Sequence, residues 1–345
     1  MNGGTLRGLR VIDAASLYAG PFISTVLADH GADVVKVEPP GGDPYRQRPL
    51  WAILARNKRS VTLDLDSAAG CDRLRDLVAH VDVLVVNLLP RQLERRRLTW
   101  ERLSAVNPDL VFVCVTSFGL DGPNADLPGS GTLGEAFAGL THLTGRPDGK
   151  PMLASVPVGD AVTGWVGAFG VLAACYARAN GARGQVVDVN PVDALLHLAA
   201  PALAEWEPGR PPATRLDGRL AGSPVRNTYR CRDGAWVAIS CSTSRHLRQL
   251  SELVGRGTDM DDAVAVWVAQ APRAEVIAQL TARRLPVAPV HDAASVQADP
   301  HIVARRAIRT VASTELGRRA VAAPAPRFSH SGECPAQRCP DVGEG

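Results

Sequence analysis

The feature that most constrains this fold is a repeated alternation of short apolar segments with helical segments in the first half of the chain. The segments at residues 32–38, 81–87 and 110–116 carry runs of apolar, largely β-branched side chains. Strands that are apolar on both faces lie in parallel sheets that helices cover on both sides. The pattern therefore predicts an α/β fold with a mostly parallel sheet. Ligands of such sheets bind in the loops at the carboxyl ends of the strands.

Further segments extend this pattern and divide the chain into two domains. Residues 206–221 are rich in Pro and Gly, which marks an exposed linker. Residues 227–241 alternate around Asp233-Gly234, a strong hairpin signal between two strand-like runs. We expect a large α/β domain over residues 1–205 and a smaller α/β domain over residues 222–305. The other expected strands lie at residues 9–15, 60–64 and 185–189, and the expected helices at residues 68–79, 93–106, 192–203, 246–254, 261–269 and 272–284.

Composition and charge narrow the class of protein. The chain has 345 residues, of which 46% are hydrophobic, and a formal net charge of +3. Its Lys and Arg side chains are spread among Asp and Glu, so a nucleic-acid partner is not expected. The seven cysteines form no C-x-x-C pair and no zinc-like cluster, which predicts free thiols, no metal site and a cytoplasmic setting. No N-terminal signal pattern and no membrane-spanning apolar run are expected.

One acidic residue stands at a position where a carboxylate could do chemistry. Asp160 follows Val156-Pro-Val-Gly and precedes a run of small and apolar residues at 161–178. That run is apolar nearly all round, which is typical of a buried helix. As a helix N-cap, Asp160 would accept hydrogen bonds from unpaired backbone N–H groups. As a nucleophile, it would be kept ionised by the helix dipole, with N–H donors nearby for a developing oxyanion. The two interpretations are compatible.

A glycine motif nearby matches the dinucleotide-binding pattern G-x-G-x-x-G. Its glycines are Gly129, Gly131 and Gly134. The pattern requires a strand running directly into the first glycine and an acidic residue about twenty positions later at the end of a second strand. Here a long loop comes before the motif, and Asp148 lies in a Pro-Asp-Gly turn. We therefore interpret these residues as a mobile loop rather than a nicotinamide site. The chain also lacks a G-x-S-x-G elbow and a Walker loop.

Taken in order, the motifs of this chain resemble those of the class III CoA-transferases, the CaiB/BaiF type. This family includes formyl-CoA transferase, carnitine CoA-transferase and α-methylacyl-CoA racemase. The resemblance begins with LRGLRVID and continues along nearly the whole chain. The matching segments are residues 6–13, 19–21, 27–38, 57–60, 63–65, 81–87, 107–108, 117–119, 121–123, 143–145, 159–160, 184–185, 228–236, 289–290 and 299–301.

The resemblance implies a fold and an assembly. Residues 1–205 would form a Rossmann-like CoA-binding domain to which the tail at 306–345 returns. Residues 206–221 would be the linker to the small α/β domain at 222–305. Two such chains would thread through one another as an interlocked homodimer.

The resemblance also implies a chemistry. Asp160 would attack an acyl-CoA thioester, and a mixed anhydride and then an aspartyl-CoA thioester would form before a small carboxylate takes over the CoA. Tyr18, Ala19, Asn87 and Arg95 resemble residues that line the CoA site, with Arg95 as a forked donor to the nucleotide phosphates. Coenzyme A and acyl-CoA would be substrates, with no tightly bound cofactor and no membrane partner.

The chain departs from the family pattern in two places. Family members carry an aromatic residue or His followed by a carboxylate where this chain has Ser130-Gly131. Racemases place a proton-transfer His there, so we favour a transferase over a racemase or epimerase. The glycine-rich flap of formyl-CoA transferase is reduced to residues 221–224. A CoA-binding relative without turnover is therefore a third hypothesis.

Overall fold

The chain forms two units, each with its own hydrophobic core. The structure is a computed structural model that describes residues 4–255, 259–330 and 338–344. Residues 141–152 and 206–221 group with the smaller of the two units. The large unit comprises Met1–Leu140, Leu153–Glu205 and Ala304–Gly345, and the small unit comprises Thr141–Met152 and Trp206–Val303.

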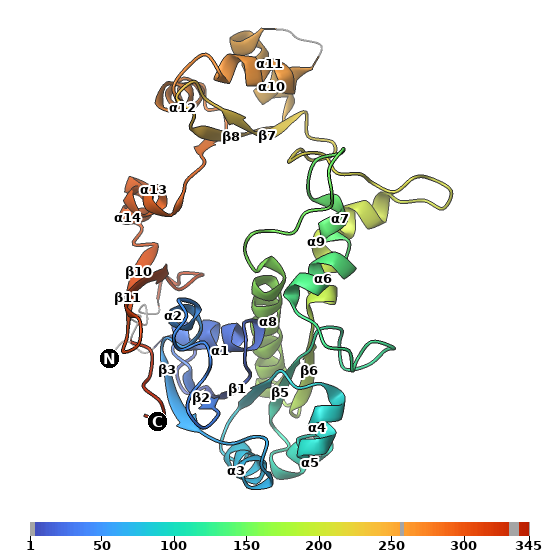
Figure 1. Cartoon of the computed structure of the whole chain (residues 1–345), viewed down its shortest axis with the longest axis vertical. Helices are drawn as coiled ribbons and strands as arrows, with labels where there is room; N and C mark the ends of the chain where they lie inside the picture. The colour runs from blue at the N-terminus through green and yellow to red at the C-terminus, as the bar shows by residue number, and fades with distance from the viewer. Residues whose placement is uncertain (1–3, 256–258, 331–337, 345) are drawn as a thin grey trace. The chain divides into compact units, whose positions relative to one another are not determined.

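A six-stranded sheet forms the centre of the large unit (Figure 1). Its order is β3-β2-β1-β4-β5-β6, and every neighbouring pair is parallel. This confirms the predicted α/β class. Because the order reverses between β1 and β4, a crevice opens there at the carboxyl ends of the strands. The strands are β1 (Arg10–Ala14), β2 (Asp33–Glu38), β3 (Lys58–Thr62), β4 (Val83–Val86), β5 (Val111–Val115) and β6 (Gln185–Val189).

Helices cover both faces of this sheet because its central strands are apolar on both sides. All four residues of β4 are fully buried. One core joins the sheet to α1 (Ala19–Asp29) and α8 (Val158–Ala179). The core on the other face joins it to α3 (Ala68–Val78), α4 (Pro90–Arg96) and α5 (Trp100–Val106).

The single helix predicted at residues 93–106 is wrong. The structure has α4 and α5 instead, and the chain turns between them at Arg97, whose φ is 55°. This left-handed conformation ends α4. The turn sends Leu98 into the core, where it is fully buried.

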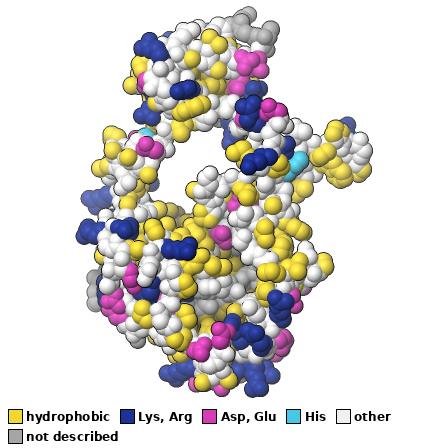
Figure 2. Space-filling view, viewed as in Figure 1, with side chains coloured by type: hydrophobic (Ala, Val, Ile, Leu, Met, Phe, Trp, Pro, Cys, Tyr) yellow, Lys and Arg dark blue, Asp and Glu magenta, His cyan; other side chains and the backbone are white. Residues whose placement is uncertain are grey.

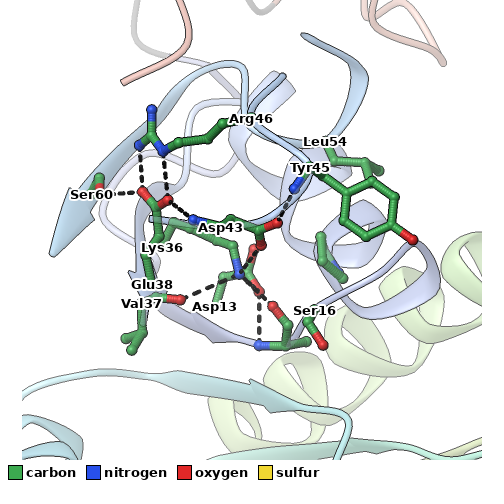
Figure 3. Close-up of polar contacts among 12 residues, drawn as sticks. Asp13, Ser16, Lys36, Val37, Glu38, Asp43, Tyr45, Arg46, Leu54 and Ser60 are labelled. Atoms are coloured by element: carbon green, nitrogen blue, oxygen red, sulfur yellow. Dashed lines mark hydrogen bonds and ion pairs between the residues drawn. The ribbon is translucent and has the colours of Figure 1, made fainter. Parts of the chain in front are cut away.

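Buried charges lie under the loop that joins β1 to α1 (Figure 3). Figure 3 shows Lys36 between Asp13 and Asp43, with Nζ 3.8 Å from an oxygen of each and bonded to the Ala15 carbonyl. Lys58 Nζ lies 2.8 Å from Asp13 Oδ2. It also donates to the Pro21 carbonyl and the Ser24 hydroxyl. Burial opposes ionisation of Asp13, but the two lysines hold its pKa below the ordinary value. The buried charges thus fix both ends of the loop.

The C-terminal segment adds a hairpin to the large unit. β10 (Ile308–Ser313) and β11 (Gly317–Ala322) pair antiparallel. Their Val311 and Val321 pack in one core with Trp51 of α2 (Leu50–Leu54), and Cys339 completes this core. The sequence pattern of residues 306–345 did not predict this hairpin.

The small unit consists of a three-stranded antiparallel sheet and helices. The predicted hairpin at Asp233-Gly234 is confirmed, and Gly234 has a φ of 80° that suits glycine. Leu250, Val264 and Val276 are fully buried in its core. The strands are β7 (Val225–Arg230), β8 (Trp236–Cys241) and β9 (Val287–Pro289), and the helices are α10 (Ser244–Val254), α11 (Met260–Val268), α12 (Arg273–Ala282) and α13 (Ala293–Ala298), followed by α14 (Pro300–Ala304).

The prediction that α8 is buried all round is wrong. Its small residues, such as Gly164 and Gly167, pack against α1, while Phe169 and Tyr176 are 72% and 74% exposed. Contrary to expectation, α8 is long and apolar enough to cross a membrane by length and composition. Its packing against α1, α9 (Pro191–Glu205), β5 and β6 is that of a core helix.

Candidate active site

A cavity of about 210 Å³ opens at the point where the strand order reverses. Its walls are the loop after β1, the loop after β4, the loop after β5 and the first turn of α8. This is the location at which open parallel sheets bind their ligands. The side chains and backbone that face it include Tyr18, Ala19, Asn87, Ser117, Gly131, Asp160 and Thr163.

Asp160 is not the N-cap of its helix. Pro157 occupies that position, and Asp160 is the third residue of α8. Its carboxylate instead receives a hydrogen bond from the backbone of Gly131. Burial raises the pKa of Asp160, and the negative charge of Glu135 adds to this, while the Gly131 bond opposes it. The side chain therefore faces the cavity with one fixed donor and is available for chemistry.

The glycine motif forms a packed helix start rather than a mobile loop, so that prediction is wrong. α6 (Gly131–Phe137) begins inside it. A Cβ at Gly131 would lie 2.5 Å from the Asp160 nitrogen and 2.6 Å from its carboxyl group. A Cβ at Gly134 would lie 2.5 Å from Pro191, and one at Gly129 would lie 2.6 Å from Ser117. The three glycines thus allow close approach of neighbouring segments.

The loop before α1 brings Tyr18 and Ala19 to the cavity. Leu17 has a φ of 67°, an uncommon conformation for a residue other than glycine. Such conformations persist where the surroundings impose them, and they often occur in binding sites. Burial, the charge of Asp160 and the opposing effect of Arg56 leave the pKa of Tyr18 above its ordinary value. Tyr18 is therefore a neutral hydroxyl at the mouth of the site.

Asn87 holds the same loop from the opposite wall. Its Oδ1 accepts from the Ser16 N–H at 3.0 Å, and its Nδ2 donates to the Ser16 carbonyl at 3.0 Å. Because Asn87 follows β4 and Ser16 follows β1, these bonds join the two loops across the switch point. Asn87 therefore lines the cavity and also shapes it.

Arg95 is not brought into this cavity. It lies on α4 and lines a second cavity of about 570 Å³ with Arg75, Arg96 and Arg97. Figure 2 shows Lys and Arg side chains gathered over α3, α4 and α5. In this second cavity Arg96 forms an ion pair with Asp66 through Nη2. Its Nε is buried and has no hydrogen-bond partner among the described residues.

Sequence reasoning missed Glu135. Its side chain is only 4% exposed and accepts a hydrogen bond from the Gly159 N–H at 3.0 Å. An acidic residue four positions after Gly131 on a short helix gives no local sign of this contact. The donor, the Gly159 N–H, lies 24 positions away in sequence.

The cavity supplies one carboxylate and neutral donors. Among the described residues that line it, Asp160 and Tyr18 are the titratable side chains. No group of three or more His, Cys, Asp or Glu side chains placed to hold a metal ion occurs in the described ranges. The arrangement suits a carboxylate that attacks a carbonyl carbon.

The sheet order and the cavity together define an α/β protein with a candidate substrate site at the switch point of a parallel sheet. This chain belongs to CoA-transferase family III, whose sequence profile matches residues 6–345. The resemblance drawn from its motifs is thereby confirmed, and the chain is a CoA-transferase by family.

Characterised relatives and a solved structure agree with this assignment. The succinyl-CoA–D-citramalate CoA-transferase of Chloroflexus aurantiacus is 33% identical over 94% of this chain and 88% of its own. The beta subunit of succinyl-CoA–L-malate CoA-transferase from that organism is 34% identical over 90% of this chain and 84% of its own. A CaiB/BaiF family protein from Brucella suis is 27% identical, with a TM-score of 0.86 over 100% of this chain and 97% of that one.

Proposed function

We propose that the enzyme is an acyl-CoA:carboxylate CoA-transferase that works through covalent intermediates on Asp160. The observation that carries this proposal is the position of Asp160 in the cavity at the switch point, next to the Gly131 N–H. A carboxylate in the first turn of a helix is favoured by the helix dipole, and neighbouring N–H groups stabilise a developing oxyanion.

The reaction has four balanced steps. Asp160 attacks the thioester carbonyl, the C–S bond breaks, and a mixed anhydride and CoA thiolate form. The thiolate then attacks the Asp160 carbonyl, which releases the donor's carboxylate and leaves an aspartyl-CoA thioester. The acceptor carboxylate attacks that thioester and gives a second anhydride and thiolate. Attack of the thiolate on the acceptor's carbonyl yields the new acyl-CoA and regenerates the Asp160 carboxylate.

Two cavities of the large unit fit the two ends of a CoA ester. The thioester would lie beside Asp160, and the nucleotide phosphates would lie in the second cavity, where Arg95 and its neighbours offer forked donors. Leu89 of the first cavity comes just before α4, and Arg95 lies near the other end of that helix. At about 1.5 Å per residue, the two walls are separated by roughly 10 Å along α4, which the extended pantetheine arm can span.

The relatives suggest the substrate class. Two relatives are named for succinyl-CoA as donor, with D-citramalate or L-malate as acceptor. We propose a short acyl-CoA of this kind as donor and a small dicarboxylate as acceptor.

We also propose that the enzyme is a homodimer. Along α8, Trp165, Phe169, Leu172 and Tyr176 follow one another at helical spacing and are all exposed. Figure 2 shows hydrophobic side chains reaching the surface over this part of the large unit. The stripe carries no charge, so a second copy of the same apolar face is the complementary partner.

The lining of the cavity favours transfer over racemisation. Two-base racemisation needs a second base beside the α-carbon, and positions 130 and 131 supply only serine and glycine. Solvent deuterium that enters the α-carbon without an acceptor would nevertheless identify a racemase. CoA binding without either reaction would identify a silent binder.

The first test traps the covalent intermediates. The enzyme is incubated with succinyl-CoA or other short acyl-CoAs and hydroxylamine, which converts an aspartyl thioester or anhydride to a hydroxamate. Peptide mass spectrometry should place the hydroxamate on Asp160. Asp160→Asn should lose both the adduct and the CoA transfer, whereas Asp193→Asn, in the first turn of α9, should retain them. An active Asp160→Asn variant would contradict the proposal.

A further inference from the structure

The helices α6 and α8 exchange hydrogen bonds between their first two turns. The Gly131 backbone of α6 bonds to the Asp160 carboxylate of α8. In return, Glu135 Oε1 of α6 accepts from the Gly159 N–H of α8 at 3.0 Å. Each helix thus satisfies an N-terminal donor of the other, which would otherwise lack a partner. The nucleophile and the peptide before it are therefore held by residues of one short helix.

Glu135 is a buried acidic residue whose carboxylate is bound by the Gly159 N–H. Its side chain is 4% exposed, and a buried carboxylate is costly unless hydrogen bonds satisfy it. It does not line the cavity, so it cannot touch the substrate. Its effect on the reaction must pass through Gly159 and Asp160.

The charge of Glu135 also acts on Asp160. After burial, it is the second influence that raises the pKa of Asp160. Among the described residues that line the cavity, the other titratable group is Tyr18, which is neutral, and Arg56 in turn acts on Tyr18. From α9, Pro191 contacts α6, while the Asp193 carboxylate is bound by Asn190 at 2.8 Å.

We propose that Glu135 is a positioning residue that fixes the Gly159–Asp160 peptide and adds a fixed negative charge beside the nucleophile. This inference rests on the covalent role proposed for Asp160. Glutamine at 135 would keep an oxygen acceptor for Gly159 but remove the charge. Aspartate would keep the charge but fall short of Gly159, and alanine would remove both.

The experiment measures the pH dependence of kcat/KM and kcat for CoA transfer from succinyl-CoA to L-malate. Asp160 attacks only when ionised, so activity falls as the pH drops through its pKa. Without the charge at 135 that pKa falls, and the acid limb of Glu135→Gln should move to lower pH. Its kcat on the plateau should stay within about threefold of the unchanged enzyme. Because every variant meets the same substrates, titration of the substrates cancels in the comparison.

The other variants separate charge from hydrogen bond. Glu135→Asp should keep the acid limb in place but lose about tenfold in plateau kcat, because misplaced nucleophiles react slowly. Glu135→Ala should lose kcat and also shift the limb. Glu101→Gln, on the exposed side of α5, is the control and should change neither.

The outcomes distinguish this inference from the proposed function. If transfer requires Asp160 but the Glu135→Gln profile overlies that of the unchanged enzyme, the inference about Glu135 is wrong and the covalent mechanism stands. If Asp160→Asn still transfers CoA, the proposed mechanism itself fails. Should Glu135→Gln fold poorly by circular dichroism, an unchanged plateau kcat in Glu135→Asp would still overturn the inference.

Discussion

At the scale of single residues, the site depends on the absence of a side chain at position 131. The family resemblance leads one to expect a carboxylate there, yet Gly131 lies directly against the Asp160 backbone and carboxyl group. Any Cβ would overlap both. Glycine at position 131 therefore lets Asp160 pack directly against the α6 backbone, where its carboxylate accepts from the Gly131 N–H.

Gly131→Ala should disrupt this contact. The new methyl group would lie 2.5 Å from the Asp160 nitrogen, so Asp160 or α6 must shift. We expect a loss of about 10²-fold in kcat, the usual cost of misplacing a reacting group by an ångström. Steady-state kinetics measures it. The control is Gly149→Ala, where the nearest atom would be 3.4 Å away, and a loss of activity there as large as in Gly131→Ala would contradict the explanation.

The sequence placed part of the site and not the rest. Tyr18, Ala19 and Asn87, named from the resemblance, lie around one cavity with Asp160. They lie together because they follow β1 and β4, and parallel strands bring their carboxyl ends to one edge of the sheet. Arg95 was expected near CoA and lies in a second cavity. Glu135 could not be found, because its role depends on a contact between helices and not on a local pattern.

At the scale of secondary structure elements, long apolar strands were predictable and short irregular helices were not. The strand at residues 185–189 was placed with its observed bounds, since both of its ends are marked by polar or glycine residues. α6 begins among glycines, which disfavour helices, and forms because it packs on α8 and α9. The β10–β11 hairpin was missed, although Gly317 at its turn has a φ of 68°, and its Val311 and Val321 pack in one core with Trp51.

One guanidinium holds this hairpin segment to the sheet. Arg46 donates to Glu38 at 2.5 and 2.7 Å, to Glu315 at 2.7 Å and to the Pro340 carbonyl at 2.9 Å. Its guanidinium carbon also lies 4.6 Å from the centre of the Trp51 ring. Glu38 is fully buried and would lose its charged partner if Arg46 were removed.

Arg46→Ala should therefore destabilise the enzyme by about 3 kcal/mol or more, the usual cost of leaving one partner of a buried ion pair alone. Urea unfolding measures this loss, and limited proteolysis should cut first within the C-terminal segment. The neighbouring Arg48 is exposed, and its guanidinium lies over the Tyr45 ring. Arg48→Ala should change stability by less than about 1 kcal/mol, and an equal loss in both variants would argue against this role for Arg46.

At the scale of the whole molecule, the exposed apolar stripe on α8 (Trp165, Phe169, Leu172 and Tyr176) is the surface through which we expect two copies to form a dimer. Phe169→Glu places a charge in the middle of this stripe and should weaken a dimer at least tenfold, because a buried unpaired charge is costly. Light scattering after size exclusion measures the mass. Val266→Glu alters another exposed apolar residue, on α11, and should leave the mass unchanged. A monomeric unmodified enzyme would contradict both the dimer and its interlocked form.

The return of the C-terminal hairpin to the large unit has a consequence for how the chain is made. Val311, Val321 and Cys339 complete a core whose other half, around Trp51, leaves the ribosome much earlier. The small unit is translated between these two halves and can close on its own residues first. The core of the large unit around α2 is therefore complete only after residues 308–339 have been translated. During synthesis we expect this nascent chain to expose an apolar surface of the kind that chaperones bind.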